Sequence, residues 1–271
     1  MPGRRTRCAR RLPRRVVTKN CAYGYGVGRI LVGTSGFVYA HWRGVFYPED
    51  LPQRLWFARY TSEFRTVELN NTFYRLPRPD AVDRWRRDAP PGFVFAAKGS
   101  RFITHMKRLT DPGEAVARYF EPVSRLREKL QVVLWQLPPR WKVNAGRLDE
   151  FLAALPRGLR YAFEFRDESW YSEAICDVLD ARGAAFCEHD LVARRPPRLT
   201  GGFRYVRFHG HTGKYQGRYG ARALEPWARD LARSARRSDA FVYFNNDVGG
   251  HAIEDARALI GLLGEVAHAH P

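Results

Sequence analysis

The chain has 271 residues, of which 45% are hydrophobic, and this supplies enough apolar material for one large domain or two small ones. No apolar run approaches the roughly 18–20 residues of a membrane-spanning helix, so the sequence predicts a cytoplasmic protein without a membrane partner. The net charge of +18 favours anionic partners, although an arginine-rich composition that only maintains solubility explains it as well.

Residues 1–28 are predicted to be a disordered basic arm, because they lack hydrophobic periodicity. Residues 1–29 contain eight Arg, one Lys and no acidic residue. The arginines are not followed by the apolar stretch of a secretory signal, but an organelle transit peptide and a wrongly assigned start codon are alternatives. The remainder, 29–267, is expected to form a single domain because no linker interrupts it.

The four cysteines predict neither a disulfide framework nor a zinc site. They include no C-x-x-C pair, and no His follows at zinc-finger spacing. So few cysteines in so long a chain indicate reduced thiols. Cys176 falls in a predicted helix and Cys187 in a predicted strand, where both are expected to be buried.

From residue 29 onward, short β-branched and aromatic runs alternate with longer amphipathic stretches. The predicted strands are 29–37, 66–73, 93–99, 131–138, 160–166, 184–190, 204–210 and 240–247. The predicted helices are 51–64, 79–89, 114–130, 146–155, 172–183, 222–237 and 251–266. The connection 191–202 is too rich in Pro and Gly for a good helix.

This alternation favours an α/β fold, and eight repeats in about 240 residues favour a closed TIM-type (β/α)8 barrel. An open, doubly wound parallel sheet is the rival fold. Such a sheet would normally carry a Gly-rich phosphate-binding turn after its first strand, and GTSGFVYAHW is only a poor version of that turn.

Polar residues alternate with apolar residues along most of the predicted strands. In YAFEFRDESW (161–170), Glu164 lies between Phe163 and Phe165, and Arg166 follows. Because strand side chains alternate between two faces, the apolar set is expected to face the helices and the polar set the barrel interior. Polar groups at the C-terminal strand ends then lie where barrel enzymes build their sites.

The inward polar set predicted in this way contains seven ionisable groups from six strands. They are Glu68, Lys98, Glu164, Arg166, Glu188, Arg207 and His209. Their charges roughly balance, as burial requires. A paired network that merely closes the top of the barrel is the alternative, but hydrophobic residues would fill that space at lower cost.

Six sequence blocks resemble, in order, the signature blocks of the domain-of-unknown-function-72 (DUF72) family, also called YecE-like. The blocks are ELNNTFYRLP (68–77), KGSRFITH (98–105), LWQLPPRW (134–141), EFRDESW (164–170), YVRFHGHTGKYQGRYG (205–220) and YFNNDVGGHAIEDA (243–256). The resemblance covers nearly all of the chain beyond the arginine-rich arm. It implies a TIM-type barrel, in agreement with the strand count, and it implies no particular activity.

The loops that follow the last two predicted strands suit an anion, because barrel enzymes often bind phosphate there. The first loop contains Lys214 and Arg218, and the second contains Gly249 and Gly250, whose backbone N–H groups can approach a ligand closely. We expect a phosphate or carboxylate subsite between these loops. A flexible basic lid without a ligand is the alternative.

Catalytic roles are assigned to Glu68, Lys98, Glu164, Glu188 and His209. Neighbouring carboxylates raise one another's pKa, so that one can donate a proton while another accepts one. Lys98 would stabilise developing negative charge, and it is also a candidate for Schiff-base formation if it is desolvated. For Lys98 and His209 a paired structural role is the alternative.

The remaining candidates are expected to bind the substrate. They are Asn70, Tyr74, Gln136, Arg166, Trp170, Arg207, Lys214, Tyr215, Arg218, Asn245, Gly249 and Gly250. Their aromatic members suit stacking on bases or sugars, although packing in the core or in a lid explains them equally well. No organic cofactor is evident, and a metal held by His209, His211 and Glu188 is a weaker alternative because Asp is scarce on the inward faces.

Together these features favour an enzyme, hydrolase- or isomerase-like, that performs acid–base chemistry on an anionic, phosphorylated ligand at the C-terminal barrel mouth. The alternative is a nucleic-acid-binding protein without turnover, which would use the basic arm and the lid loops. A degenerate barrel that serves as a scaffold is a third interpretation.

Overall fold

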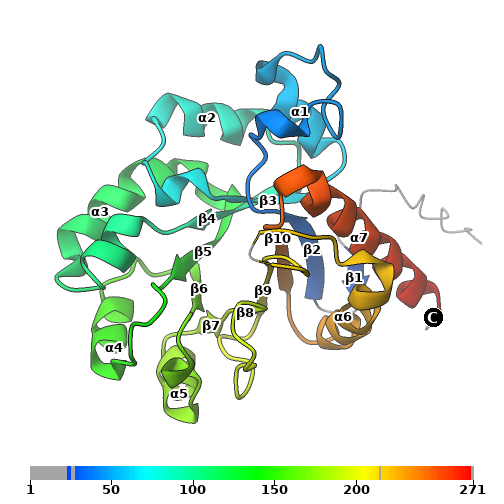
Figure 1. The fold of residues 1–271 in the computed structure, drawn as a ribbon. Helices are drawn as coiled ribbons and strands as arrows, with labels where there is room; N and C mark the ends of the chain where they lie inside the picture. Colours follow the sequence, from blue (N-terminus) through cyan, green and yellow to red (C-terminus); the bar gives the residue numbers. More distant parts are fainter. Residues whose placement is uncertain (1–22, 26–27, 214, 270–271) are drawn as a thin grey trace, which may run out of the picture.

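The computed structural model describes residues 23–25, 28–213 and 215–269, in which strands alternate with helices as predicted (Figure 1). The strands are β1 (Tyr23–Tyr25), β2 (Gly28–Thr34), β3 (Thr66–Leu69), β4 (Val94–Lys98), β5 (Leu130–Gln136), β6 (Arg160–Glu164), β7 (Ala184–Phe186), β8 (Glu188–His189), β9 (Arg204–Phe208) and β10 (Ala240–Phe244). The α-helices are α1 (Trp56–Thr61), α2 (Pro79–Asp88), α3 (Pro112–Val123), α4 (Ala145–Ala153), α5 (Glu173–Ala181), α6 (Gly220–Ser234) and α7 (His251–Ala269). The short helical turns are η1 (Ala40–Trp42), η2 (Gln53–Leu55), η3 (Asn71–Phe73), the π-helix η4 (Phe102–Met106), η5 (Ser124–Lys129), η6 (Glu168–Trp170) and η7 (Val248–Gly250).

Local sequence signals explain several helix ends. Helix α2 begins at Pro79, whose fixed φ suits a first helical position. The side chain of Asn144 accepts a hydrogen bond from the backbone N–H of Arg147 and so caps α4. Gly183 follows α5 with a φ of 64°, a left-handed conformation that glycine adopts without strain. These signals set where α2 and α4 begin and where α5 ends.

The strand pairings form two five-stranded sheets, ordered β1-β2-β10-β9-β8 and β3-β4-β5-β6-β7. All pairs are parallel except β1 with β2, which is antiparallel. The α/β fold with parallel strands is therefore confirmed. One closed sheet, which a TIM-type barrel would show, is not found among the pairings of the described residues.

The two sheets meet along both of their edges. On one side Ser35 bridges Glu68, and the N–H of Gly36 donates to the carbonyl of Glu68 at 2.7 Å. On the other side the segment predicted as one strand, 184–190, is split at Cys187 into β7, which pairs with β6, and β8, which pairs with β9. The same segment thus borders both sheets.

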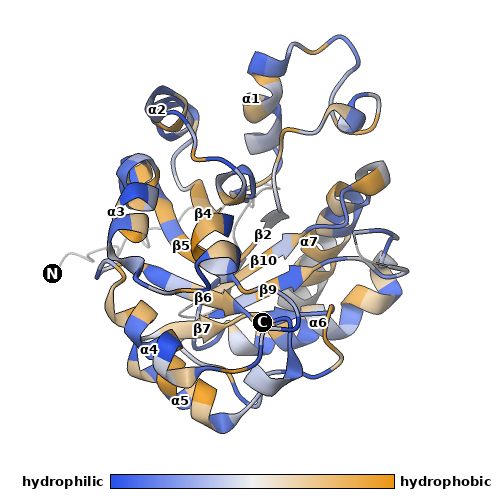
Figure 2. Cartoon of the chain, turned by 60° about the vertical axis from the view of Figure 1, so that its left-hand side comes forward, coloured by the Kyte–Doolittle hydropathy of each residue, from blue (hydrophilic) through white to orange (hydrophobic). Residues whose placement is uncertain are grey.

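Two apolar clusters fill the fold (Figure 2). The larger lies between the strands and the surrounding helices. The smaller lies on the opposite faces of the strands and draws on both sheets; it consists of Leu31, Val94, Ala96, Val132, Leu134, Ala162, Ala185, Cys187, Phe203, Tyr205, Phe241 and Tyr243. Strands β2, β4, β5, β6, β7, β9 and β10 contribute to both clusters, so each has an outward and an inward face, and their inward faces form a common interior.

Other sequence predictions have mixed outcomes. Cys176 and Cys187 are buried free thiols, as predicted, whereas Cys8, Cys21 and most of the predicted arm, residues 1–22 and 26–27, lie outside the described residues. The described end of that arm includes β1, a strand that the sequence pattern did not predict. None of the helices in the described ranges combines the length and the apolar character that crossing a membrane requires.

Candidate functional site

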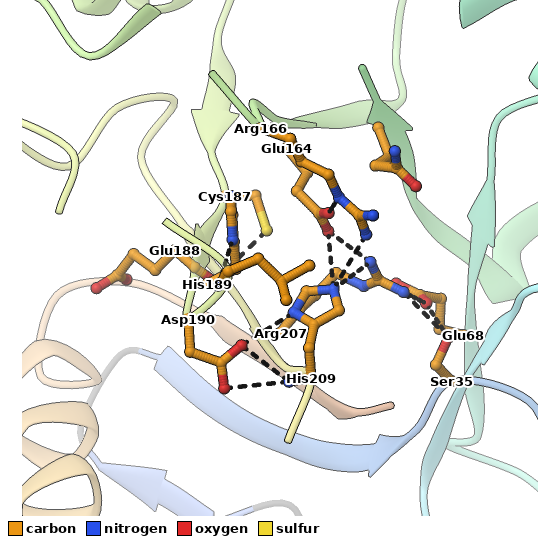
Figure 3. Close-up of polar contacts among 12 residues, drawn as sticks. Ser35, Glu68, Glu164, Arg166, Cys187, Glu188, His189, Asp190, Arg207 and His209 are labelled. Atoms are coloured by element: carbon orange, nitrogen blue, oxygen red, sulfur yellow. Dashed lines mark hydrogen bonds and ion pairs between the residues drawn. The ribbon is translucent and has the colours of Figure 1, made fainter. Parts of the chain in front are cut away.

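Figure 3 shows a buried ion network in the interior. The network shares the inward strand faces with the smaller apolar cluster, since Tyr205 of that cluster hydrogen-bonds Glu68. Arg207 of β9 binds Glu68 of β3 at 2.8 Å and Glu164 of β6 at 2.5 Å, and all three side chains are fully buried. Side chains of a strand alternate between its two faces, so each of these three residues points inward while the residues before and after it point outward. The structure therefore brings together these three residues, which were predicted to share the interior.

Every carboxylate oxygen of this network already has a donor. Oε1 of Glu68 accepts from Ser35 and Arg207, and Oε2 accepts from the hydroxyl of Tyr205 at 2.6 Å. Burial opposes ionisation, but Arg207 and these hydrogen bonds outweigh it and lower the pKa of Glu68. Burial also opposes the ionisation of Glu164, but the charges of Arg166 and Arg207 outweigh it and hold the pKa of Glu164 well below its ordinary value. Both groups stay carboxylates at neutral pH and are poor proton donors.

Arg166 and His209 extend the network toward the mouth of the interior. The Nε of Arg166 donates to Glu164 at 2.6 Å, and its Nη2 lies 3.4 Å from Nε2 of His209. Nη1 of Arg207 also lies 3.0 Å from that Nε2. The same Nε2 lies 3.5 Å from the carboxylate of Glu164, and Nδ1 lies 3.1 Å from the carboxylate of Asp190. The ring of His209 is therefore held between two carboxylates and two guanidinium groups.

Lys98 differs from the other members of the interior because it is unpaired. It ends β4, is 4% exposed, and its Nζ lies 4.1 Å from the centre of the Phe73 ring. Its amine makes no hydrogen bond or ion pair with any residue in the described ranges. Burial and the charge of Arg207, partly offset by Glu164 and Glu68, lower the pKa of Lys98 to about 7. Lys98 can therefore gain and lose a proton near neutral pH.

Glu188 does not belong to this cluster, so its predicted place in the site is wrong (Figure 3). Its carboxylate binds Arg204 at 2.8 and 2.9 Å, and Arg204 also binds Asp230 of α6 at 2.9 Å. Glu188 lies two residues after Phe186, whose ring belongs to the outer apolar cluster. The same alternation that directs Glu164 inward therefore directs Glu188 outward, beneath α6.

Two aromatic residues predicted to bind substrate have other surroundings. Trp170 is 1% exposed, stacks on Phe165 at 4.7 Å and donates its indole N–H to the carbonyl of Trp141, so it is a core residue. Tyr74 is 75% exposed and lines a cavity of about 490 Å³ together with Arg75 and residues of η4 and α3. Neither residue contacts the ion network directly.

Three carboxamides follow the inward alternation at the strand ends. Gln136 ends β5 and is 3% exposed, with its amide nitrogen on the carbonyl of Leu137 and 3.4 Å from His105. Asn245 follows β10 and is 5% exposed. Asn70 follows β3, and its Oδ1 is buried without a hydrogen-bond partner in the described chain. These groups leave hydrogen-bonding capacity around Lys98 and Glu164.

The anion subsite predicted between the last two loops is not assembled by the residues that are described. Arg218 is exposed and lies 3.4 Å from Glu254, and the N–H of Gly250 already donates to the carbonyl of Asp247. Gly249 and Gly250 adopt left-handed φ values of 75° and 79°, and Lys214 lies outside the described residues. Among the described residues of these loops, Tyr215 reaches the cluster with its hydroxyl 3.5 Å from Arg166, and Tyr219 donates a hydrogen bond to Asp190.

Comparison with known proteins identifies the family of the chain. The profile of a family described as "Protein of unknown function DUF72" matches residues 31–271. The chain belongs to the DUF72 family. The UPF0759 protein YunF of Bacillus subtilis is 27% identical over 253 residues, which cover 80% of this chain and 89% of YunF. The UPF0759 protein YecE of Escherichia coli is 30% identical over 115 residues, 42% of each chain.

Solved DUF72 structures share the fold. A DUF72 family protein of Thermotoga maritima, 29% identical, matches with a TM-score of 0.77 and covers 88% of this chain and 99% of its own. One from Enterococcus faecalis, 18% identical, matches with a TM-score of 0.75 over 87% of this chain and 95% of its own. The second likeness, at so low an identity, supports the fold alone.

Three members of the cluster in this DUF72 chain were not predicted from the sequence. Ser35 and Tyr205 complete the hydrogen bonds of Glu68, and both lie at inward positions by the same alternation. Asp190 binds the ring and the backbone N–H of His209 from the loop after β8. The alternation is a signal for the first two, but nothing local signals Asp190, because its role depends on a contact 19 residues away.

A metal held by His209, His211 and Glu188 does not fit this geometry. Glu188 binds Arg204 on the outer side, and the ring of His211 lies beside Tyr219 at 5.5 Å. Within the part of the chain that the structure describes, no three His, Cys, Asp or Glu side chains are grouped as metal ligands. The chemistry that the cluster offers is that of an amine, two guanidinium groups, two carboxylates and an imidazole.

Proposed function

We propose that this DUF72 protein is an enzyme that performs acid–base chemistry on an anionic, phosphorylated or carboxylated small molecule at the C-terminal ends of its strands. The observation that carries the proposal is Lys98, a buried and unpaired amine whose pKa of about 7 lies well below the ordinary lysine value. Perturbed groups of this kind concentrate at catalytic sites, because a proton is transferred most efficiently near the pKa of the catalyst.

The ion network supports this role by holding the surrounding groups in place. Glu164 binds Arg166 and Arg207 simultaneously, and His209 lies against both guanidinium groups. The Nη atoms of Arg166 have only long contacts, at 3.4 and 3.5 Å, so they retain the capacity to bind an anion. In this scheme Glu68 and Arg207 are positioning residues, and Lys98 exchanges the proton.

We further propose that the two sheets act as one (β/α)8 barrel. The Ser35–Glu68 bridge and the shared segment 184–189 join the sheets along both edges, and Tyr243 of β10 hydrogen-bonds Thr66 of β3 across the interior at 2.7 Å. A crystal structure with β2 and β3 in separate layers would contradict this proposal. Cytoplasmic location is likewise a prediction, which fractionation of cells would check.

The function is tested by metabolite capture. The full chain and its Lys98→Met variant are incubated with a metabolite extract, washed and analysed by mass spectrometry. We expect the wild type to retain an anionic compound that Lys98→Met loses by about tenfold or more, the loss of one charge-assisted contact. Lys142→Met is the matched control, since Lys142 is exposed and binds Asp167. Equal retention by wild type and Lys98→Met would refute the proposal.

The nucleic-acid alternative rests on the net charge of +18. Binding to single-stranded RNA or DNA by charge alone falls steeply with salt and does not depend on one buried amine. A salt titration of RNA binding therefore separates the two functions. Tight, salt-sensitive binding that Lys98→Met leaves unchanged, together with no captured metabolite, would favour the alternative.

A further inference from the structure

Lysine is rare in this chain, which contains six lysines and 40 arginines. The other three described lysines each bind an oxygen: Lys107 the carbonyl of Asp111 at 3.0 Å, Lys129 the carbonyl of Ala89 at 2.6 Å and Lys142 the carboxylate of Asp167 at 3.4 Å. Lys98 alone among them has no oxygen partner. A guanidinium would serve any purely ionic role here as well, whereas only an amine can form a carbon–nitrogen double bond with a carbonyl compound.

The backbone around Lys98 is fixed from several sides. Its carbonyl accepts hydrogen bonds from Thr72 at 2.6 Å and Tyr119 at 3.2 Å. At Gly99 an added Cβ would lie only 2.1 Å from the ring of Trp135, so the chain fits closely against that ring. The side chain is buried against the Phe73 ring, 4.1 Å from Nζ, and its nitrogen makes no hydrogen bond with the described residues. A fixed nitrogen with an available lone pair is the geometry that nucleophilic attack needs.

The groups around the amine match an anionic carbonyl compound. Arg166 retains donors for an anionic group. Asn70 directly follows the end of β3 at Leu69, whose register partner is Ala97, so the backbones of Asn70 and Lys98 leave neighbouring strand ends side by side. The unpartnered Oδ1 of Asn70 can accept a hydrogen bond from a hydroxyl formed next to Lys98.

We propose that Lys98 forms an imine with a substrate that carries an aldehyde or ketone and an anionic group. The neutral amine attacks the carbonyl carbon, a C–N bond forms, and the C=O electron pair moves to oxygen, which takes up a proton. The resulting hydroxyl then leaves as water after a second proton transfer, while the nitrogen loses its proton or remains as the iminium. One water is released for each imine, and no oxidant or reductant takes part.

This inference rests on the proposed function and narrows it to carbonyl substrates. It is tested by trapping with sodium cyanoborohydride, which reduces an imine to a stable amine. The full chain is incubated with glyoxylate, pyruvate or dihydroxyacetone phosphate as anionic probes and with neutral dihydroxyacetone for comparison. Intact-mass and peptide mass spectrometry then locate the adduct. Formaldehyde, in a separate reaction, measures the reactivity of the amine independently of any substrate preference.

We expect the anionic probes to label Lys98 roughly a hundredfold faster than exposed lysines, because an ordinary lysine is almost fully protonated at about pH 7.5. Lys98→Met should lose this adduct, and Lys142→Arg should keep it. Arg166→Met should reduce the preference for anionic over neutral probes while formaldehyde still labels Lys98.

Labelling distributed equally over surface lysines, or none at Lys98 with any probe, would overturn imine formation. If Lys98→Met still loses the captured metabolite in that case, the acid–base function stands without the imine. If metabolite capture is also independent of Lys98, both proposals fail.

Discussion

Strand β9 carries two buried arginines on opposite faces, and their surroundings differ. Arg204, at the start of the strand, binds Glu188 and Asp230 beneath α6. Arg207, three residues further along β9, binds the carboxylates of Glu68 and Glu164 in the interior. Both arginines therefore form ion pairs with two carboxylates, and both are almost completely buried.

The difference between them lies in what surrounds each pair. The outer pair, Arg204 with Glu188 and Asp230, connects β9 to β8 and α6, and the carboxylate of Asp230 is partly exposed to solvent. The inner pair lies below Arg166, His209 and Lys98, at the C-terminal strand ends where barrel enzymes react. A buried ion pair is therefore no sign of a site by itself. The unpaired amine beside the inner pair is what distinguishes it.

The largest effect is expected for Arg207→Met. Removing this guanidinium leaves Glu68 and Glu164 buried without their shared counter-ion, so the free energy of unfolding should fall by about 3–5 kcal/mol. Urea unfolding at neutral pH measures it. Adding Glu68→Gln and Glu164→Gln to Arg207→Met should recover part of the loss. A loss below about 1 kcal/mol would show that water or other groups compensate the two carboxylates.

A smaller effect is expected for Arg204→Met. The side chain of Asp230 is 39% exposed, so water can solvate it when the arginine is removed, and we expect a loss of about 1.5–3 kcal/mol. Cyanoborohydride labelling of Lys98 should be unchanged in the folded variant. If Arg204→Met reduced that labelling, the separation into an outer and an inner pair would be wrong.

The alternation of strand side chains predicted most of this comparison. It directed Glu68, Glu164 and Arg207 inward because each is flanked by apolar residues that pack against helices. Applied to Glu188, the alternation gives the outward direction, because Phe186 shares its face and packs in the larger apolar cluster. The prediction that Glu188 faces inward is wrong because it groups Glu188 with the other charged residues by its charge. The alternation along a strand therefore predicts which side chains face the interior better than their charge does.

Other features depend on contacts between distant segments and have no local signal. Asp190 reaches His209 from a loop, and the break at Cys187 lets one segment pair with both sheets. The indole of Trp170 is buried against Phe165 and Trp141, and the Trp141 carbonyl accepts its N–H. Above all, the sequence predicts that Lys98 faces inward but not that its amine has no partner. Whether the amine is paired depends on which groups Glu68 and Glu164 bind, and in the structure both bind Arg207.

Lys98→Met tests the amine through the pH dependence of stability. In the folded chain Lys98 releases its proton near pH 7, and in the unfolded chain near its ordinary value of 10.5. Between these values the unfolded chain binds more protons, so raising the pH favours the folded state. The stability of the wild type relative to Lys98→Met should rise by up to about 1.4 kcal/mol per pH unit across this window.

Urea unfolding of both proteins at a series of pH values measures this difference. Lys142→Met, compared with the wild type in the same way, should show no such rise. A relative stability that stays flat from neutral to alkaline pH would mean that Lys98 remains protonated in the folded chain, paired with a group that the described contacts do not include.

The smallest effect is expected for a third arginine, on the surface. Arg257 of α7 binds Glu63 near the end of α1 through two hydrogen bonds of 2.8 and 2.9 Å, a better geometry than that of many exposed pairs. Its side chain is 45% exposed, so solvent screens the attraction and Arg257→Ala should cost about 0.2–1 kcal/mol. A double-mutant cycle with Glu63→Ala isolates the pair energy. A coupling as large as the loss from Arg204→Met would show that bidentate geometry, rather than burial, determines how strongly arginines stabilise this fold.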